Sequence, residues 1–258
     1  MKTAEKLGRV GLFIPCYIDQ VYPHVGMATV RLLEKLGVPF EYPDGQTCCG
    51  QPQFNSGCFR EAAKLARKLF QIFRDFDQIV CPSGSCTGMI REYYSLLLDK
   101  EKDTPEFRRL ISQTYELCEF IIDVLKVEQV DGAFPHRVGL HQSCHGLRGL
   151  GLGVPSEIVV SERTGKVYRL LKSLRGIEIV TLSRSDECCG FGGTFSVFEP
   201  VVSSFMGRDT LKDHEEAGAE IIASYDVSCL MHLDGLIRRD KRPLRVMHIA
   251  EILAGALG

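Results

Sequence analysis

The amino-acid sequence contains the same tripeptide twice, two adjacent cysteines followed by a glycine. The first copy is Cys48-Cys49-Gly50 and the second is Cys188-Cys189-Gly190. Each copy lies between two further cysteines that are distant in the sequence. A single cysteine pair would carry little information, because free cysteine is often a small buried hydrophobic residue. Two pairs with outer cysteines predict two thiolate sites that bind metal.

The sequence around the two tripeptides is also repeated. Arg9-Val10-Gly11-Leu12 ends four residues before Cys16, and Arg137-Val138-Gly139-Leu140 ends four residues before Cys144. These repeats predict that a unit of roughly half the chain was duplicated, too long for a solenoid repeat. The two predicted ligand sets use eight of the eleven cysteines, and they are Cys16, Cys48, Cys49, Cys86 and Cys144, Cys188, Cys189, Cys229.

Composition limits the classes of function. The chain has 258 residues, of which 45% are hydrophobic and 25% charged, which is typical of a globular protein. A formal net charge of -2 argues against binding of nucleic acid through its phosphates. The sequence has neither a signal-peptide core nor an apolar run long enough to span a membrane, so we expect a cytoplasmic protein. Thiols stay reduced there, which favours metal or redox sites over disulfides.

Short apolar runs alternate with amphipathic stretches in the first half of the chain. This order predicts parallel strands connected by helices, an α/β fold. We expect strands at 11–15, 38–42 and 78–81, and helices at 25–36, 59–73 and 87–98. Cys16, the Cys48-Cys49 pair and Cys86 would then all follow the carboxyl ends of strands, the edge where open α/β sheets bind ligands.

The second half repeats this plan. We expect strands at 138–140, 178–182 and 220–223, a helix at 200–217, and a strand end with a closing helix at 246–257. An apolar stripe over 107–125 predicts a helix that connects the halves and buries Cys118. The prediction is therefore two small α/β halves with mainly parallel sheets, residues 1–130 and 131–258, related by a pseudo-twofold axis.

The chemistry of thiolates leaves two kinds of metal site open. Iron-sulfur clusters and zinc both select cysteine sulfur, and four ligands is the usual number for each. Adjacent residues of a regular strand point to opposite faces, so both sulfurs of a pair can reach one metal only where the chain turns. Gly50 and Gly190 allow that turn.

Other cysteines and histidines are weaker candidates. Cys81 lies five residues before Cys86 and is an alternative ligand, whereas Cys58 is expected in packing or at the surface. His141 and His145 flank Cys144 and could donate hydrogen bonds to a cluster sulfur, although isolated histidines are more often structural.

The chain resembles the family of duplicated Cys-Cys-Gly cysteine-rich domains, which occurs in heterodisulfide reductase and in the iron-sulfur subunits of glycolate oxidase and anaerobic glycerol-3-phosphate dehydrogenase. The resemblance covers nearly the whole chain. Five stretches carry it: 15–20, 47–52, 81–86, 187–193 and 228–232.

The resemblance implies an iron-sulfur centre in each half, held by a cysteine, a cysteine pair and a closing C-x-x-C motif. In this chain the last cysteine of that motif is replaced by Met89 in one half and by His232 in the other. Each half thus keeps four matched thiolates, with Cys81 and His232 as possible additions. The implied cofactor is one or two [4Fe-4S] clusters, and zinc in one or both sites is the alternative.

The resemblance to family members that act on lactate implies that this chain is an electron-transfer subunit. The complex would oxidise L-lactate, or a related 2-hydroxy acid, to pyruvate. The implied partners are a ferredoxin-like iron-sulfur protein and a third subunit. The sequence has no flavin or nicotinamide signature of its own. Two alternatives remain: a cluster that reduces disulfides, as in heterodisulfide reductase, and a zinc-stabilised scaffold without redox activity.

Overall fold

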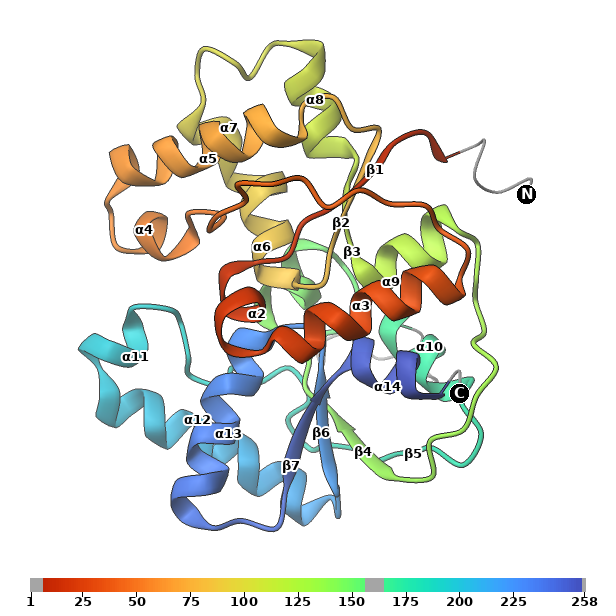
Figure 1. Ribbon diagram of the computed structural model, residues 1–258. Helices are drawn as coiled ribbons and strands as arrows, with labels where there is room; N and C mark the ends of the chain where they lie inside the picture. The colour runs from red at the N-terminus through yellow and green to blue at the C-terminus, as the bar shows by residue number, and fades with distance from the viewer. Residues whose placement is uncertain (1–6, 156–164, 257–258) are drawn as a thin grey trace. The chain divides into compact units, whose positions relative to one another are not determined.

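A computed structural model describes residues 7–155 and 165–256 (Figure 1). The chain divides into two compact units, with the boundary between Leu125 and Lys126. Each unit contains its own parallel sheet with helices on it, which confirms the predicted α/β class. No helix in the described ranges is both long enough and apolar enough to cross a membrane.

The sheet of the first unit has three parallel strands in the order β1-β2-β3. They are β1 (Val10–Leu12), β2 (Gln78–Cys81) and β3 (Thr114–Glu116). The predicted strand at 38–42 is wrong, because only a single bridge joins Gly11 and Glu41. Glu41 exchanges two backbone hydrogen bonds with β1, but the next residues that would donate, 39 and 43, are both proline and have no N–H.

The helices of the first unit largely follow the predicted periodicity. They are α2 (Cys16–Val21), α3 (Pro23–Lys35), α4 (Gln51–Asn55), α5 (Phe59–Phe73), α6 (Gly84–Gly88), η1 (Met89–Tyr93), α7 (Tyr94–Leu97), α8 (Pro105–Ser112), α9 (Leu117–Glu119) and η2 (Phe120–Val124). The apolar stripe of α5 buries Ala62, Ala66, Leu69 and Phe73. Its Phe73 packs edge-to-face on Phe13 beside β1 and so joins helix to sheet.

The predicted connecting helix over 107–125 is interrupted by β3. Strand β3 pairs with β2, and a carboxyl oxygen of its Glu116 then accepts hydrogen bonds from the backbone N–H groups of Cys118 and Glu119, which begins α9. The helices on both sides of β3 belong to the first unit. They close that unit instead of connecting it to the second, and Cys118 is buried there as predicted.

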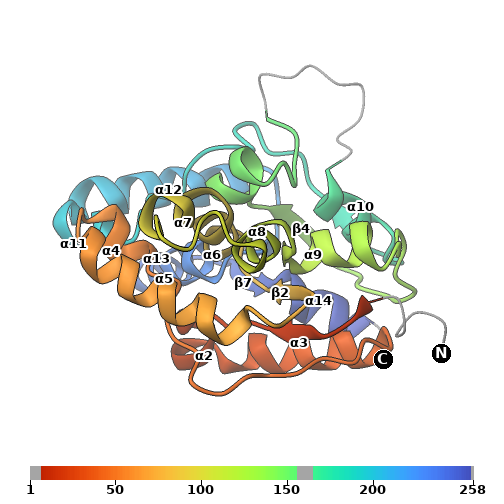
Figure 2. The ribbon, with the colours of Figure 1, turned by 90° about the horizontal axis from the view of Figure 1, so that it is seen from above.

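The second unit has four parallel strands in the order β5-β4-β6-β7. They are β4 (Arg137–Leu140), β5 (Glu178–Ile179), β6 (Ile221–Ser224) and β7 (Arg245–His248). The helices are η3 (His145–Gly149), α10 (Lys166–Lys172), α11 (Phe195–Phe198), α12 (Pro200–Glu216), α13 (Val227–Asp240) and α14 (Ile249–Ala256). Helices α12 and α13 pack side by side (Figures 1 and 2). The predicted strand and closing helix in 246–257 are confirmed as β7 and α14.

The topology of the two units shows that the duplication extends over the whole chain. Strands β1, β2 and β3 occupy the same order as β4, β6 and β7, and the bridge at Glu41 takes the place of β5. The interrupted stripe of the first unit is therefore the counterpart of β7 and α14. In both units, the residues that follow the strands therefore lie at the carboxyl edge of the sheet.

Candidate metal centres

The predicted cysteines of the first unit come from three loops at the carboxyl edge of its sheet. Cys16 begins α2 four residues after β1 ends, and Cys86 lies in α6 five residues after β2 ends. The Cys48-Cys49 pair immediately precedes Gly50 and α4. Parallel strands place these loops at one edge, so residues that are 70 positions apart in sequence approach each other.

Hydrogen bonds between sulfur atoms link this first thiolate set. The Cys49 thiol donates to Cys86 Sγ at 3.4 Å, and the backbone N–H of Gly50 donates to Cys48 Sγ at 3.3 Å. The Cys16 thiol donates to Cys48, and hydrogen bonding with Cys16 and with the adjacent Cys49 lowers the pKa of Cys48 to about 3. The same bonds raise the pKa of Cys16 and Cys49 above the ordinary range. One sulfur is thus held as a thiolate among thiols that a metal could deprotonate.

The second thiolate set repeats the first with the same offsets. Cys144 follows the end of β4 by four residues, and Cys229 follows the end of β6 by five. Gly190 N–H donates to Cys188 Sγ at 3.4 Å. The pKa of Cys188 falls to about 2 because the Cys144 and Cys189 thiols donate hydrogen bonds to it. The structure therefore brings together all four predicted cysteines in each unit.

The glycine after each pair makes the turn that lets both sulfurs face one site. Gly50 has φ of 89° and Gly190 has φ of 87°, in the left-handed region that favours glycine. A Cβ at Gly190 would also lie only 2.6 Å from the carbonyl oxygen of Ser203, and one at Gly50 would lie 3.2 Å from that of Ala62. The predicted turns are present in both units.

A buried histidine distinguishes the second site from the first. The ligand atoms of His141, Cys189 and Cys229 lie within 4.8 Å of one another. His141 is 3% exposed, and its Nε2 has no hydrogen-bond partner among the described residues. Burial acts to lower the pKa of His141, but the Cys229 sulfur beside the ring raises it above the ordinary value. The pKa of Cys229 is lowered to about 7, first by its hydrogen bond with Cys189 and also by His141.

The sequence predicted only that His141 could donate a hydrogen bond to a cluster sulfur. It did not predict that His141 lies beside Cys229. The available signal was the position of His141, which directly follows β4 where Phe13 directly follows β1. Both residues donate their backbone N–H to the neighbouring strand, Phe13 to Val80 and His141 to Ala223. Comparison of the halves therefore places a histidine ring in one unit where the other has an apolar ring.

The weaker candidates lie around these sets. Cys81 ends β2, is fully buried and donates its thiol to the carbonyl of Ser83 at 3.8 Å. Nε2 of His232 lies 3.2 Å from the carbonyl oxygen of Ser203, so α12 already uses that nitrogen. His145 is half-buried at the start of η3, and Cys58 is exposed.

The residues present fit a thiolate-bound metal. Two sulfurs at 3.4 Å can bind the same metal atom, because a tetrahedral site with metal–sulfur bonds of about 2.3 Å separates its ligands by about 3.8 Å. A ring nitrogen of His141 lies within 4.8 Å of the Cys189 and Cys229 sulfurs and offers a further ligand atom at the second site. This donor chemistry suits zinc and the irons of a cluster alike.

Comparisons with known proteins agree with the duplicated layout. The model of the CCG cysteine-rich domain matches residues 10–91 and 138–234. Lactate utilization protein A of Geobacillus thermodenitrificans is 42% identical over 245 residues, which cover 95% of this chain and 98% of that protein. The protein of that name from Bacillus subtilis is 40% identical with the same coverage.

One solved structure shares the fold. The crystal structure of a hypothetical protein from Helicobacter pylori has a TM-score of 0.56 and 10% sequence identity, and it covers 97% of this chain and 49% of that chain. At this identity the likeness concerns the fold alone.

Proposed function

Because this chain belongs to the CCG cysteine-rich domain family, we propose that each unit holds a thiolate-bound metal centre and that the protein transfers electrons in lactate utilisation. The single observation that carries this proposal is the gathering of four cysteines at the same sheet edge in both units. The family, the ligand sets and the relatives named for lactate utilization all support the same function.

The proposed ligands are Cys16, Cys48, Cys49 and Cys86 in the first unit, and Cys144, Cys188, Cys189 and Cys229 with His141 in the second. A bound iron-sulfur cluster would supply one-electron redox chemistry. The chain itself would hold the sulfurs in place and exclude water, since Cys49, Cys86, Cys189 and Cys229 are all buried. The N–H groups of Gly50 and Gly190 would donate to thiolate sulfur, which favours the anionic form.

The electron-transfer role rests on the relatives and on the nature of the ligands. The named relatives match 95% of this chain, so the proposal concerns both units. We propose that it works with a ferredoxin-like iron-sulfur protein and a further subunit that oxidise L-lactate to pyruvate. Under this proposal the chain relays electrons and need not contact lactate.

A zinc site is the second candidate. The observation that favours it is the 3.4 Å separation of Cys49 and Cys86, which suits two ligands of one ion. Reduction of disulfides by a cluster is a third outcome to be tested, because the family resemblance extends to heterodisulfide reductase.

The deciding experiment is analysis of the protein purified without oxygen. Iron, acid-labile sulfide and zinc are measured per chain, and an electron paramagnetic resonance spectrum is recorded before and after reduction. We expect iron and sulfide with a reducible signal. Stoichiometric zinc without iron would replace electron transfer by a structural role, and a protein free of metal after reconstitution would reject both. Disulfide turnover with an artificial electron donor would indicate an enzyme instead of a relay.

A further inference from the structure

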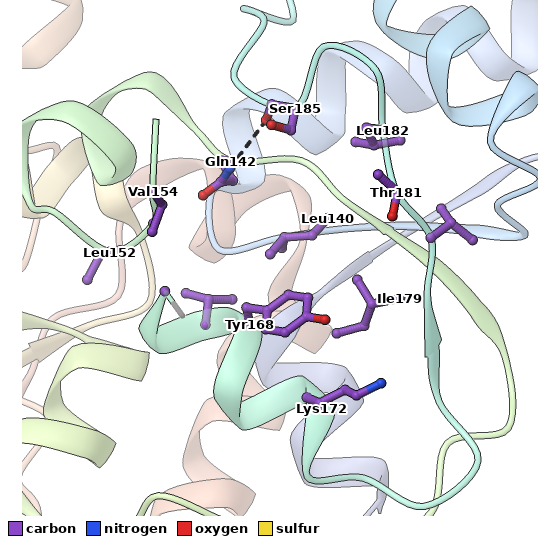
Figure 3. Close-up of a pocket in the computed structure, with 14 residues that line it drawn as sticks. Leu140, Gln142, Leu152, Val154, Tyr168, Lys172, Ile179, Thr181, Leu182 and Ser185 are labelled. Carbon is purple, nitrogen blue, oxygen red and sulfur yellow. Dashed lines mark hydrogen bonds between the residues drawn. The ribbon is translucent and has the colours of Figure 1, made fainter. Parts of the chain in front are cut away.

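The second unit contains a cavity of about 570 Å³ that is separate from the sulfur atoms. It opens beyond the carboxyl ends of β4 and β5 and is bounded on another side by α10 (Figure 3). Leu140 ends β4 and Ile179 ends β5, and both line it. Its volume lies within the range of roughly 300–1,000 Å³ for small-molecule sites, and its position is the usual one for ligands of α/β sheets.

Half of the residues that line the cavity are aliphatic. Leu140 and Ile179 lie in its middle part with the ring of Tyr168 beside them, and Leu182 lies nearer to Ser185 (Figure 3). Such a wall favours a ligand with an apolar body, because water that contacts it is released on binding.

One end of the cavity has polar groups that are buried and incompletely paired. Ser185 is 4% exposed, and its Oγ has no hydrogen-bond partner among the described residues. Gln142 is 6% exposed and donates its amide to the Ser185 carbonyl oxygen over a long 3.4 Å (Figure 3). A buried hydroxyl without a partner is unfavourable, so a ligand atom that bonds to Ser185 would gain affinity.

The other end carries a positive charge. Lys172 lies there near Tyr168, and the described residues of the lining include no aspartate or glutamate (Figure 3). Lys172 forms no ion pair with any residue in the described part of the chain. A cation without an opposing carboxylate selects an anion.

We propose that this cavity binds a small organic anion, with its carboxylate or phosphate at Lys172, its apolar body against Leu140 and Ile179, and a polar group at Ser185 and Gln142. Gln142 lies two residues before Cys144, and Ser185 lies three residues before Cys188. The bound molecule therefore contacts the two loops that carry three of the four cysteines of the second thiolate set, Cys144, Cys188 and Cys189. Binding itself does not depend on the metal or on electron transfer.

The test uses three probes of the same shape: 2-naphthoate, 2-naphthyl phosphate and the neutral 2-naphthamide. Their affinities for the purified full chain are measured by isothermal titration calorimetry at low salt. We expect one or both anions to bind about tenfold more tightly than the amide. The tighter of the two anions identifies carboxylate or phosphate as the preferred group.

Variants locate the binding. Lys172→Met should weaken anion binding about tenfold and leave the amide unchanged. Lys166→Met is the matched control, since it removes the same charge from α10 at a residue outside the lining. Thr181→Trp, at an exposed lining position, should abolish binding of all three probes.

Three results would overturn the proposal: no probe binds at millimolar concentration, the amide binds as tightly as the anions, or Lys172→Met and Lys166→Met behave alike. Circular dichroism of each variant shows whether it is folded. The metal content of Lys172→Met is measured in parallel, and we expect the parent value. A failure of ligand binding is thereby separated from a failure of the metal proposal.

Discussion

The two units share one topology and the same offsets of their outer cysteines from the strand ends, but the residues around their thiolates differ. Where the first unit has Phe13 directly after its strand, the second has His141. Where β2 ends in Cys81, β6 ends in Ser224. Six of the seven histidines lie in the second unit, and three of them, His141, His214 and His248, are buried. The positions of the cysteines relative to the strands were retained after duplication, while their electrostatic surroundings diverged.

This difference indicates that the two sites are not interchangeable. Around the first set the neighbours are mainly apolar, with Phe13 and Met89 fully buried. Around the second set, His141 reaches the sulfurs, and burial lowers the pKa of its neighbour His214 to about 3, so that His214 is neutral at pH 7. A nitrogen donor near thiolate sulfur changes the metal that a site prefers and the potential of a cluster.

The largest expected effect is the loss of metal when one cysteine of a Cys-Cys pair is replaced. Cys48→Ser should abolish metal binding at the first site and leave the second loaded, and Cys188→Ser should do the reverse, because each loses the thiolate that the other sulfurs hydrogen-bond. Metal and sulfide per chain, measured after anaerobic purification, check this.

The exposed Cys58 provides the control for these two variants. Cys58→Ser should keep the parent metal content. If Cys48→Ser and Cys188→Ser each lose all of the metal, the two sites depend on one another and the comparison of independent units is wrong.

The next effect concerns β3 and its counterpart β7, which end in Glu116 in the first unit and in His248 in the second. Burial raises the pKa of Glu116 to about 8 from 4.5. The folded protein thus retains a proton that the unfolded chain loses above about pH 4.5. Stability should fall between about pH 4.5 and pH 8, by on the order of 4 kcal/mol.

Glu116→Gln should remove this part of the pH dependence while its amide oxygen still accepts the bonds from Cys118 and Glu119. Urea unfolding of parent and variant at pH 5 and pH 8 measures the difference. Glu92→Gln, at an exposed position of the same unit, is the control. If the free energy of unfolding changes equally between pH 5 and pH 8 in the parent and in Glu116→Gln, Glu116 is not the source of this pH dependence.

The sequence predicted the parts of the fold that depend on local pattern. The bounds of α5 and β2 match the predicted ones, and the cysteines converge because loops after parallel strands share an edge. The predicted strand at 38–42 was wrong, and the sequence itself contained the reason. The prolines at 39 and 43 have no N–H group to donate to a neighbouring strand.

Tertiary pairing determined the features that the sequence did not predict. The apolar stripe over 107–125 has helical spacing on both sides of β3, and Thr114–Glu116 becomes a strand only by pairing with β2, more than 30 residues earlier. Likewise, His141 meets Cys229 across 88 positions of sequence, through the pairing of β4 with β6. Spacing within either segment carries no information about such a contact.

His141 itself supplies a direct test of divergence. If the second site holds a cluster, His141→Phe should make it resemble the first and lower its midpoint potential by on the order of 100 mV, because imidazole near iron favours the reduced state relative to thiolate alone. Redox titration followed by electron paramagnetic resonance measures this. His145→Phe is the comparison variant. A larger shift of the midpoint potential in His145→Phe than in His141→Phe would contradict the role proposed for His141.

The smallest expected difference separates the two glycine turns. Both Gly50→Ala and Gly190→Ala place a side chain at positive φ, which costs roughly 1–2 kcal/mol. Gly190→Ala should cost about 1 kcal/mol more, because its Cβ would meet Ser203 O at 2.6 Å whereas that of Gly50 would meet Ala62 O at 3.2 Å. Gly45→Ala and Gly151→Ala isolate the backbone cost, since each has positive φ with no atom within 4 Å of the added Cβ. Urea unfolding of the four variants ranks them, and equal losses for Gly50→Ala and Gly190→Ala would mean that α12 moves away from the second turn more readily than α5 moves from the first.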